Sequence, residues 1–205
     1  NINGWKFIDN LPADEKKFVV IGSPHTSNWD FWLAMVFFYR MKIKGRFTIK
    51  QKWLNFPFGI IFKKLGAIGI DRELIAKSGK SHLTDYMASL ILESKGDFAM
   101  MVTPEGTRKN CSIWKTGFYH IALKAKVPIV LAYADYKKKE LGIGMVLYPS
   151  NFERDMQIIM NFYHKIHPKN PKLFSVDSRF KKIDWDTRPL VYSCSGCSNV
   201  AQLAN

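Results

Sequence analysis

The feature that most constrains this fold is a regular alternation of short apolar runs with segments whose apolar residues recur at helical spacing. The apolar runs 18–21 and 97–103 each stop at a turn that contains a proline, which is typical of buried strands. Helical patterns occupy segments such as 28–41 and 117–125. Strands that alternate with helices of this length form βαβ units. The sequence therefore predicts an α/β fold with a mainly parallel sheet and helices on both faces.

The alternation of strands and helices also predicts where the domain ends along the chain. It covers about residues 5 to 166 and fades from His167 onward, so we expect one domain over residues 1–166. The following residues, 167–189, are rich in Pro, Lys and Asp and are expected to form a linker. Residues 190–205 are expected to be the start of a second domain, because Leu190 to Asn199 resembles the opening of a small zinc-binding domain.

The net charge and the number of cysteines limit which kinds of partner and which cellular compartment we expect for the protein. The chain has 31 Lys and Arg against 17 Asp and Glu, a formal net charge of +14. Such a surface favours anionic partners, which include nucleic acid, phosphorylated small molecules, an acidic carrier protein and an anionic membrane. Three cysteines are too few for a disulfide framework, which predicts a cytoplasmic protein. The longest apolar stretch, Phe31 to Tyr39, is far shorter than the ~20 residues of a membrane-spanning helix.

The first candidate for chemistry is the turn after the strand at 18–21. This turn carries His25, and Asp30 follows five residues later near the start of the next helix. A carboxylate that accepts a hydrogen bond from one imidazole nitrogen leaves the other nitrogen free to act as a general base. The alternative is structural: Ser27 or Asn28 caps the helix, Asp30 complements its dipole, and His25 is a loop residue.

The second candidate is the turn after the strand at 97–103. It combines Gly106, whose backbone can approach a ligand, with Thr107, which can donate to a phosphate oxygen, and Arg108, which can bind phosphate through two N–H groups. The segment resembles an anion site. Taken alone, a Pro-Glu-Gly-Thr turn is also an ordinary loop.

Together the two segments resemble the glycerol-phosphate and lysophosphatidate acyltransferases, a family marked by a His-x4-Asp block and a later Phe-Pro-Glu-Gly-Thr-Arg block. Gly66 to Arg72 resembles the second block of that family, and Val127 to Val130 resembles the fourth. The resemblance covers about residues 17 to 150. The sequence departs from the usual pattern at Pro24, Thr103 and Leu131, which leaves the acceptor and the preferred acyl chain open.

The resemblance implies acyl transfer from an acyl-CoA or acyl carrier protein thioester to the hydroxyl of a lysophospholipid or glycerol phosphate. His25 would take the proton from that hydroxyl and Asp30 would orient the imidazole. The acceptor phosphate would be held by Arg72, Arg108 and Lys50, with Glu105 and Gly106 shaping the loop around it. Lys52 lies two residues from Lys50, and for either residue the alternative is an ordinary solvated lysine. We expect no metal and no cofactor beyond the thioester donor.

Two rival functions are less well supported by the sequence. A nucleic-acid-binding protein would explain the charge, but the cations are spread along the chain and no nucleic-acid-binding motif accompanies them. A non-catalytic lipid-binding protein would not need both His25 and Asp30. We therefore expect no nucleic-acid partner.

The segment from Lys50 to Lys64 is basic and aromatic, as segments that lie on membrane surfaces are. It predicts a protein bound peripherally to the inner face of the cell membrane. Core packing is the alternative explanation for these aromatic residues.

The tail from Leu190 to Asn199 resembles the opening of small zinc-binding domains that start Tyr-x-Cys-x-Gly-Cys-Ser. Its Cys194 and Cys197 supply two thiolates, whereas a structural zinc site needs four ligands. We expect no metal at this pair.

Overall fold

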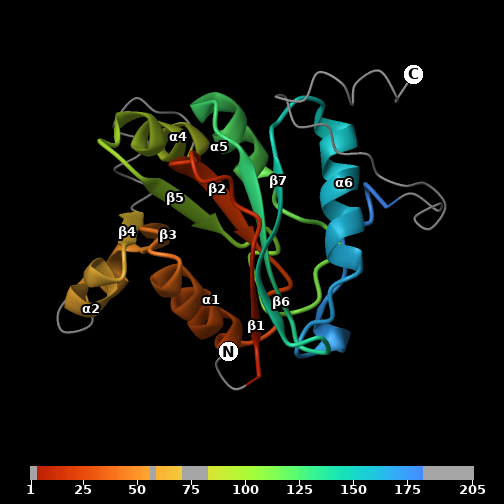
Figure 1. The fold of residues 1–205 in the computed structure, drawn as a ribbon. Helices are drawn as coiled ribbons and strands as arrows, with labels where there is room; N and C mark the ends of the chain where they lie inside the picture. The colour runs from red at the N-terminus through yellow and green to blue at the C-terminus, as the bar shows by residue number, and fades with distance from the viewer. Residues whose placement is uncertain (1–3, 56–58, 71–82, 182–205) are drawn as a thin grey trace.

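A computed structural model of the chain describes residues 4–55, 59–70 and 83–181, which form a seven-stranded sheet with helices around it (Figure 1). Its strands are β1 (Lys6–Asp9), β2 (Lys17–Gly22), β3 (Gly45–Lys50), β4 (Ala67–Ile70), β5 (Phe98–Val102), β6 (Ile129–Asp135) and β7 (Glu140–Leu147). The strand order across the sheet is β1-β7-β6-β2-β5-β3-β4.

The sheet is mainly parallel, as predicted. Strands β1 and β7 pair in parallel, and so do β2 with β5 and β6, and β3 with β4 and β5. The pair β6 and β7 is antiparallel. These two strands are joined by residues 136–139 only, a connection that suits an antiparallel hairpin and is too short for a parallel crossover.

Helices cover both faces of the sheet, which confirms the predicted α/β architecture. They are α1 (Asn28–Arg40), α2 (Gly59–Lys64), α4 (Leu83–Glu93), α5 (Gly117–Ala125) and α6 (Phe152–His164), with the 3-10 turns η1 (Gln51–Leu54) and η2 (Pro171–Leu173). On one face, Phe37 and Phe38 of α1 pack with β2 residues that include Val20. Helices α4, α5 and α6 pack on the opposite face, where Val19 and Ile21 point.

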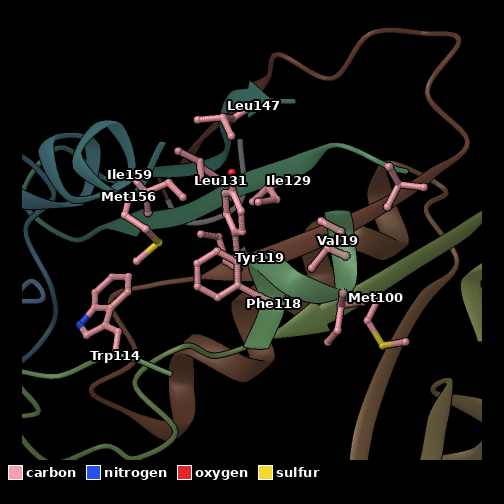
Figure 2. Packing of buried hydrophobic residues seen from close by; sticks show 14 of the residues in the cluster. Val19, Met100, Trp114, Phe118, Tyr119, Ile129, Leu131, Leu147, Met156 and Ile159 are labelled. Atoms are coloured by element: carbon pink, nitrogen blue, oxygen red, sulfur yellow. The ribbon is translucent and has the colours of Figure 1, made fainter. Parts of the chain in front are cut away.

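The larger core lies between the sheet and helices α4, α5 and α6 (Figure 2). Its members in the strands alternate with those of the α1 face, because successive side chains of a strand point to opposite sides. Burial on both faces explains why β2 and β6 appear as continuous apolar runs in the sequence. Trp114, in the loop before α5, is 2% exposed and packs against Tyr163 of α6. This contact fixes the loop that follows β5.

Strand β1 has no counterpart in the sequence-based prediction. It has four residues at the edge of the sheet, none of them fully buried, and it pairs with β7. Such a short edge strand gives little hydrophobic signal, and its partner lies far along the chain.

Residues 167–181, expected to belong to a linker, pack against the domain in the structure. Val176 is in the larger core, and Asp177 is fully buried. The carboxylate of Asp177 accepts hydrogen bonds from the backbone N–H of Trp114 and from the Arg179 guanidinium. The packed unit thus continues beyond residue 166, where we had placed the boundary. The proposed second domain at 190–205, with Cys194 and Cys197, lies outside the described residues.

None of the helices within the described ranges combines the length and apolar content needed to cross a bilayer.

Candidate active site

The turn that carries His25 connects the end of β2 to the first turn of α1. Ser27 is the N-cap of α1, and its hydroxyl accepts a hydrogen bond from the Trp29 N–H. Asp30 reaches back, and its Oδ2 accepts hydrogen bonds of 2.8 Å from the N–H groups of Thr26 and Ser27. This reciprocal arrangement is a capping box. Asp30 therefore has the structural role that we had considered as an alternative.

Asp30 also faces the imidazole of His25. Its Oδ2 lies 3.8 Å from His25 Nδ1, which is a close charge contact and too long for a hydrogen bond. Burial lowers the pKa of His25, Asp30 opposes that effect, and Arg108 adds to it. The imidazole is therefore held neutral near neutral pH, the form in which it can accept a proton.

Glu105 lies beneath the same turn and ties the two sequence segments together. Its side chain is 4% exposed and accepts hydrogen bonds from the Ser23 hydroxyl and, at 3.1 Å, from the backbone N–H of His25. Burial raises the pKa of Glu105 to about 7, although the two hydrogen bonds act in the opposite direction. Glu105 thus positions the backbone of His25 rather than lining the cavity described below.

The turn after β5 has the conformation that its glycine allows. Gly106 has a φ of +65°, and a Cβ at this position would lie 2.7 Å from Lys115 Nζ. The Thr107 hydroxyl oxygen accepts a hydrogen bond of 3.2 Å from the Lys109 N–H. Arg108 is exposed, and it lines the cavity together with Thr103, the first residue after β5.

A cavity of about 430 Å³ lies between α1 and the sheet. Its wall includes His25, Asp30 and Arg108, so two turns that are far apart in sequence meet there. Most of the remaining wall is apolar and comes from α1, α2 and the strands. These residues include Val20, Phe31, Ala34, Phe37, Phe38, Phe47, Ile49, Phe62, Met101, Ala132, Ala134 and Leu141. The site therefore combines a base, a cation and a cavity with mainly apolar walls.

The other predicted residues have different positions. Gly106 and Thr107 lie in the turn next to Arg108, and they are not among the residues that line the cavity. Lys50 is the last residue of β3, directly after Ile49 in the cavity wall. Arg72 lies outside the described residues. The phosphate-binding roles of Lys50, Thr107 and Arg72 stay predictions.

Sequence reasoning missed the support that residues 170–179 give to both turns. The Asn170 side chain donates to the Thr26 carbonyl at 3.1 Å, next to His25. Ser178 N–H donates to the Ser112 carbonyl at 2.9 Å, in the loop that follows Arg108. The polar composition of this segment resembled that of a linker, and its only sequence signal was a few isolated apolar residues.

Comparisons with known proteins bear on this arrangement. A family model described as Acyltransferase matches residues 6–133. Over 137 residues the chain is 32% identical to the 1-acyl-sn-glycerol-3-phosphate acyltransferase of Haemophilus influenzae. That alignment covers 62% of this chain and 52% of the relative, so the chain spans about half the length of this curated protein.

Among solved structures, the chain resembles the 1-acyl-sn-glycerophosphate acyltransferase PlsC of Thermotoga maritima. The TM-score is 0.47 at 16% identity, covering 72% of this chain and 63% of that one.

Proposed function

Because the chain belongs to the Acyltransferase family, whose model spans residues 6–133, we propose that it transfers a fatty acyl group from a thioester to the free hydroxyl of a lysophospholipid. Lysophosphatidate is the acceptor we favour, since the Haemophilus influenzae relative is named for it. One observation carries the proposal: His25, Asp30 and Arg108 meet on one cavity whose wall is otherwise mostly apolar.

In the proposed reaction, His25 acts as the general base. Its Nδ1 faces Asp30, which leaves Nε2 for the substrate. Nε2 takes the proton from the acceptor hydroxyl as that oxygen attacks the thioester carbonyl. The tetrahedral intermediate then collapses, the carbon–sulfur bond breaks, and the imidazolium returns the proton to the thiolate. The products are an ester and a free thiol, and no acyl-enzyme is formed.

The same cavity offers matching surfaces for the two substrates. The Arg108 guanidinium suits the acceptor phosphate, because its planar N–H groups match phosphate oxygens. The apolar wall suits a fatty acyl chain. Acyl-CoA and acyl carrier protein both remain candidate donors, since both are anionic and the chain is strongly basic. The thioester is itself activated, so the reaction requires no resident cofactor.

Replacing the proposed base tests the function. We expect purified protein to release thiol from an acyl-CoA or acyl carrier protein only when lysophosphatidate is present, and to form phosphatidate detected by mass spectrometry. His25→Ala should reduce turnover by a factor of about 10² to 10⁴. His120→Ala, an exposed histidine of α5, is the matched control and should keep normal turnover. Lipid binding without thiol release in the wild-type protein would instead identify a non-catalytic lipid-binding protein.

We also propose that the protein binds peripherally to the inner face of the membrane, where its acceptor lies. One stripe of α1 presents exposed apolar side chains three or four residues apart, namely Trp29, Trp32, Val36 and Tyr39. Ile60 and Ile61 of α2 are also exposed and are followed by the exposed lysines Lys63 and Lys64. Apolar side chains beside lysines are suited to an anionic lipid surface. The sequence predicted a membrane contact only in the 50–64 segment, and the proposed surface also includes α1.

Vesicle co-sedimentation tests this surface. We expect stronger binding to anionic than to neutral vesicles, with the electrostatic part weakened by salt. The double variant Trp29→Ser, Trp32→Ser should reduce the binding that survives high salt. Leu123→Ser is the matched control, because Leu123 is a half-exposed apolar residue of α5 on the opposite face of the sheet. Equal losses in the two variants would contradict the assignment of α1 to the membrane.

A further inference from the structure

The hydroxyl of Tyr136 touches the candidate dyad from outside the region that the family model matches. Tyr136 follows β6, whereas the family match ends at residue 133. Its hydroxyl donates a hydrogen bond of 2.6 Å to Asp30 Oδ1. The length is typical of an O–H donor on an ionised carboxylate, which is among the stronger hydrogen bonds in proteins.

This bond divides the two oxygens of Asp30 between different partners. Oδ2 accepts from the N–H groups of Thr26 and Ser27 and faces His25 Nδ1. Oδ1 accepts from Tyr136. The carboxylate is thus fixed at both ends, and the oxygen beside the imidazole stays there because the other is held.

Tyr136 is itself held in place by two other parts of the chain. Its backbone N–H donates to the His167 carbonyl at 2.9 Å, and its ring meets that of Trp5 edge to face with centroids 5.2 Å apart. Burial and the bond to Asp30 both raise the pKa of Tyr136 far above its ordinary value. The hydroxyl therefore stays protonated and remains a donor throughout the working pH range.

We propose that Tyr136 is a positioning residue for the His25–Asp30 dyad. Its hydroxyl sets the orientation and the effective charge of the Asp30 carboxylate. The proposal rests on the proposed function. Tyr136 is not among the residues that line the cavity, so it acts through Asp30 and not on the substrate. Its loss should therefore lower kcat and leave the KM of both substrates nearly unchanged.

The direction of the effect on His25 follows from the charges around it. Among the residues that the structure describes, Asp30 and Arg108 are the charged groups that act on the imidazole, and Glu105 contacts the backbone N–H of His25. A hydrogen bond from Tyr136 disperses the negative charge of Asp30. Without that bond the full charge acts on the imidazolium and stabilises it, because an opposite charge favours the charged form. The pKa of His25 should therefore rise when the Tyr136 hydroxyl is removed.

The experiment compares Tyr136→Phe with Tyr148→Phe. Both changes remove one hydroxyl that donates to a carboxylate, since Tyr148 donates to Glu15 at the surface, and Tyr148 is not among the cavity residues. For Tyr136→Phe we expect kcat to fall by roughly ten- to a hundredfold. The acid limb of its pH profile should move to higher pH by roughly half a unit or more. Tyr148→Phe should match the wild-type protein in both measurements.

A second measurement does not depend on turnover. The pKa of His25 is read from an NMR titration of the histidine ring signals, with the His25 signal assigned from its absence in His25→Ala. We expect this pKa to rise in Tyr136→Phe and to stay unchanged in Tyr148→Phe. Unchanged titration and kcat in Tyr136→Phe would overturn the proposal, and so would a selective rise in an acceptor or donor KM. If the wild-type protein transfers no acyl group, the proposed function fails, and the titration still decides whether Tyr136 controls the dyad.

Discussion

The side chain of Asp30 has two roles, because it caps a helix and also lies beside the candidate catalytic base. It completes the capping box of α1 and faces His25 at 3.8 Å. The two explanations that the sequence left open are therefore compatible. A short carboxylate at the third position of a helix reaches back to the preceding turn, and here that turn contains the candidate base.

The buried side chain of Glu105 should give the stability of the protein an unusual dependence on pH. The pKa of Glu105 is raised from 4.5 to about 7 by burial, so the folded chain keeps a proton that the unfolded chain has already released in this range. The free energy of unfolding should therefore fall as pH rises from 4.5 to 7 and level off above 7. The contribution is about 3 kcal/mol, at about 1.4 kcal/mol for each unit of pKa.

The measurement is the difference in unfolding free energy between the wild-type protein and Glu105→Gln, obtained by urea denaturation across this pH range. We expect the wild-type protein to lose stability relative to the variant between pH 4.5 and 7. The lowered pKa of His25 acts in the opposite sense, and it is common to both proteins. Glu153→Gln, which removes an exposed carboxylate of α6, is the control for the loss of one acidic group. A constant difference at all pH values would contradict the assignment.

At the scale of elements, the segment 167–181 holds the loop that carries Arg108. Asp177 accepts from the Trp114 N–H at 2.8 Å and from the Arg179 guanidinium at 2.7 Å, and it is fully buried. Arg179 in turn donates to the Trp114 carbonyl. Both backbone groups of Trp114 are thus satisfied from this segment.

Removing that carboxylate should be costly. Asp177→Ala leaves the buried N–H of Trp114 and the Arg179 guanidinium without their partner, and we expect the free energy of unfolding to fall by about 3 kcal/mol. Chemical denaturation measures the loss. In the control Lys124→Ala, which breaks the ion pair with Asp85 on the surface, the loss should stay below about 0.5 kcal/mol. Similar losses in the two variants would show that Asp177 does not anchor the loop.

The elements also show what sequence reasoning can and cannot reach. Strand β2 and helix α5 were predicted almost to the residue, because their apolar spacing reflects burial in the domain. Strand β1 was missed because its stability comes from pairing with β7. For the site, the two turns were found from residue types. The contacts of Tyr136 and Asn170 were not, because each joins residues more than 100 positions apart, which local patterns do not report.

On the scale of the whole molecule, the packed unit is longer than the region that the family model recognises. The model ends at residue 133, whereas β7, α6 and the segment to residue 181 complete the sheet and both cores. We therefore expect a chain of residues 1–166 to unfold at a lower temperature than a chain of residues 1–181. The reason is that the shorter chain lacks Val176 and Asp177. Thermal unfolding followed by circular dichroism measures the difference, and equal midpoints would restore the boundary predicted at residue 166.

The pairing of β1 with β7 has a further consequence for synthesis of the chain. Lys6 pairs with Glu140, which is translated roughly 130 residues later. At a typical ~5 to 20 residues per second, the ribosome needs on the order of ten seconds to cover that distance. Until then the first strand has no neighbour, and Phe7 can reach Phe37 of α1 but not the edge of a finished sheet. Strand β1 is therefore translated long before its partner β7 and takes its native place in the sheet only after β7 has been made.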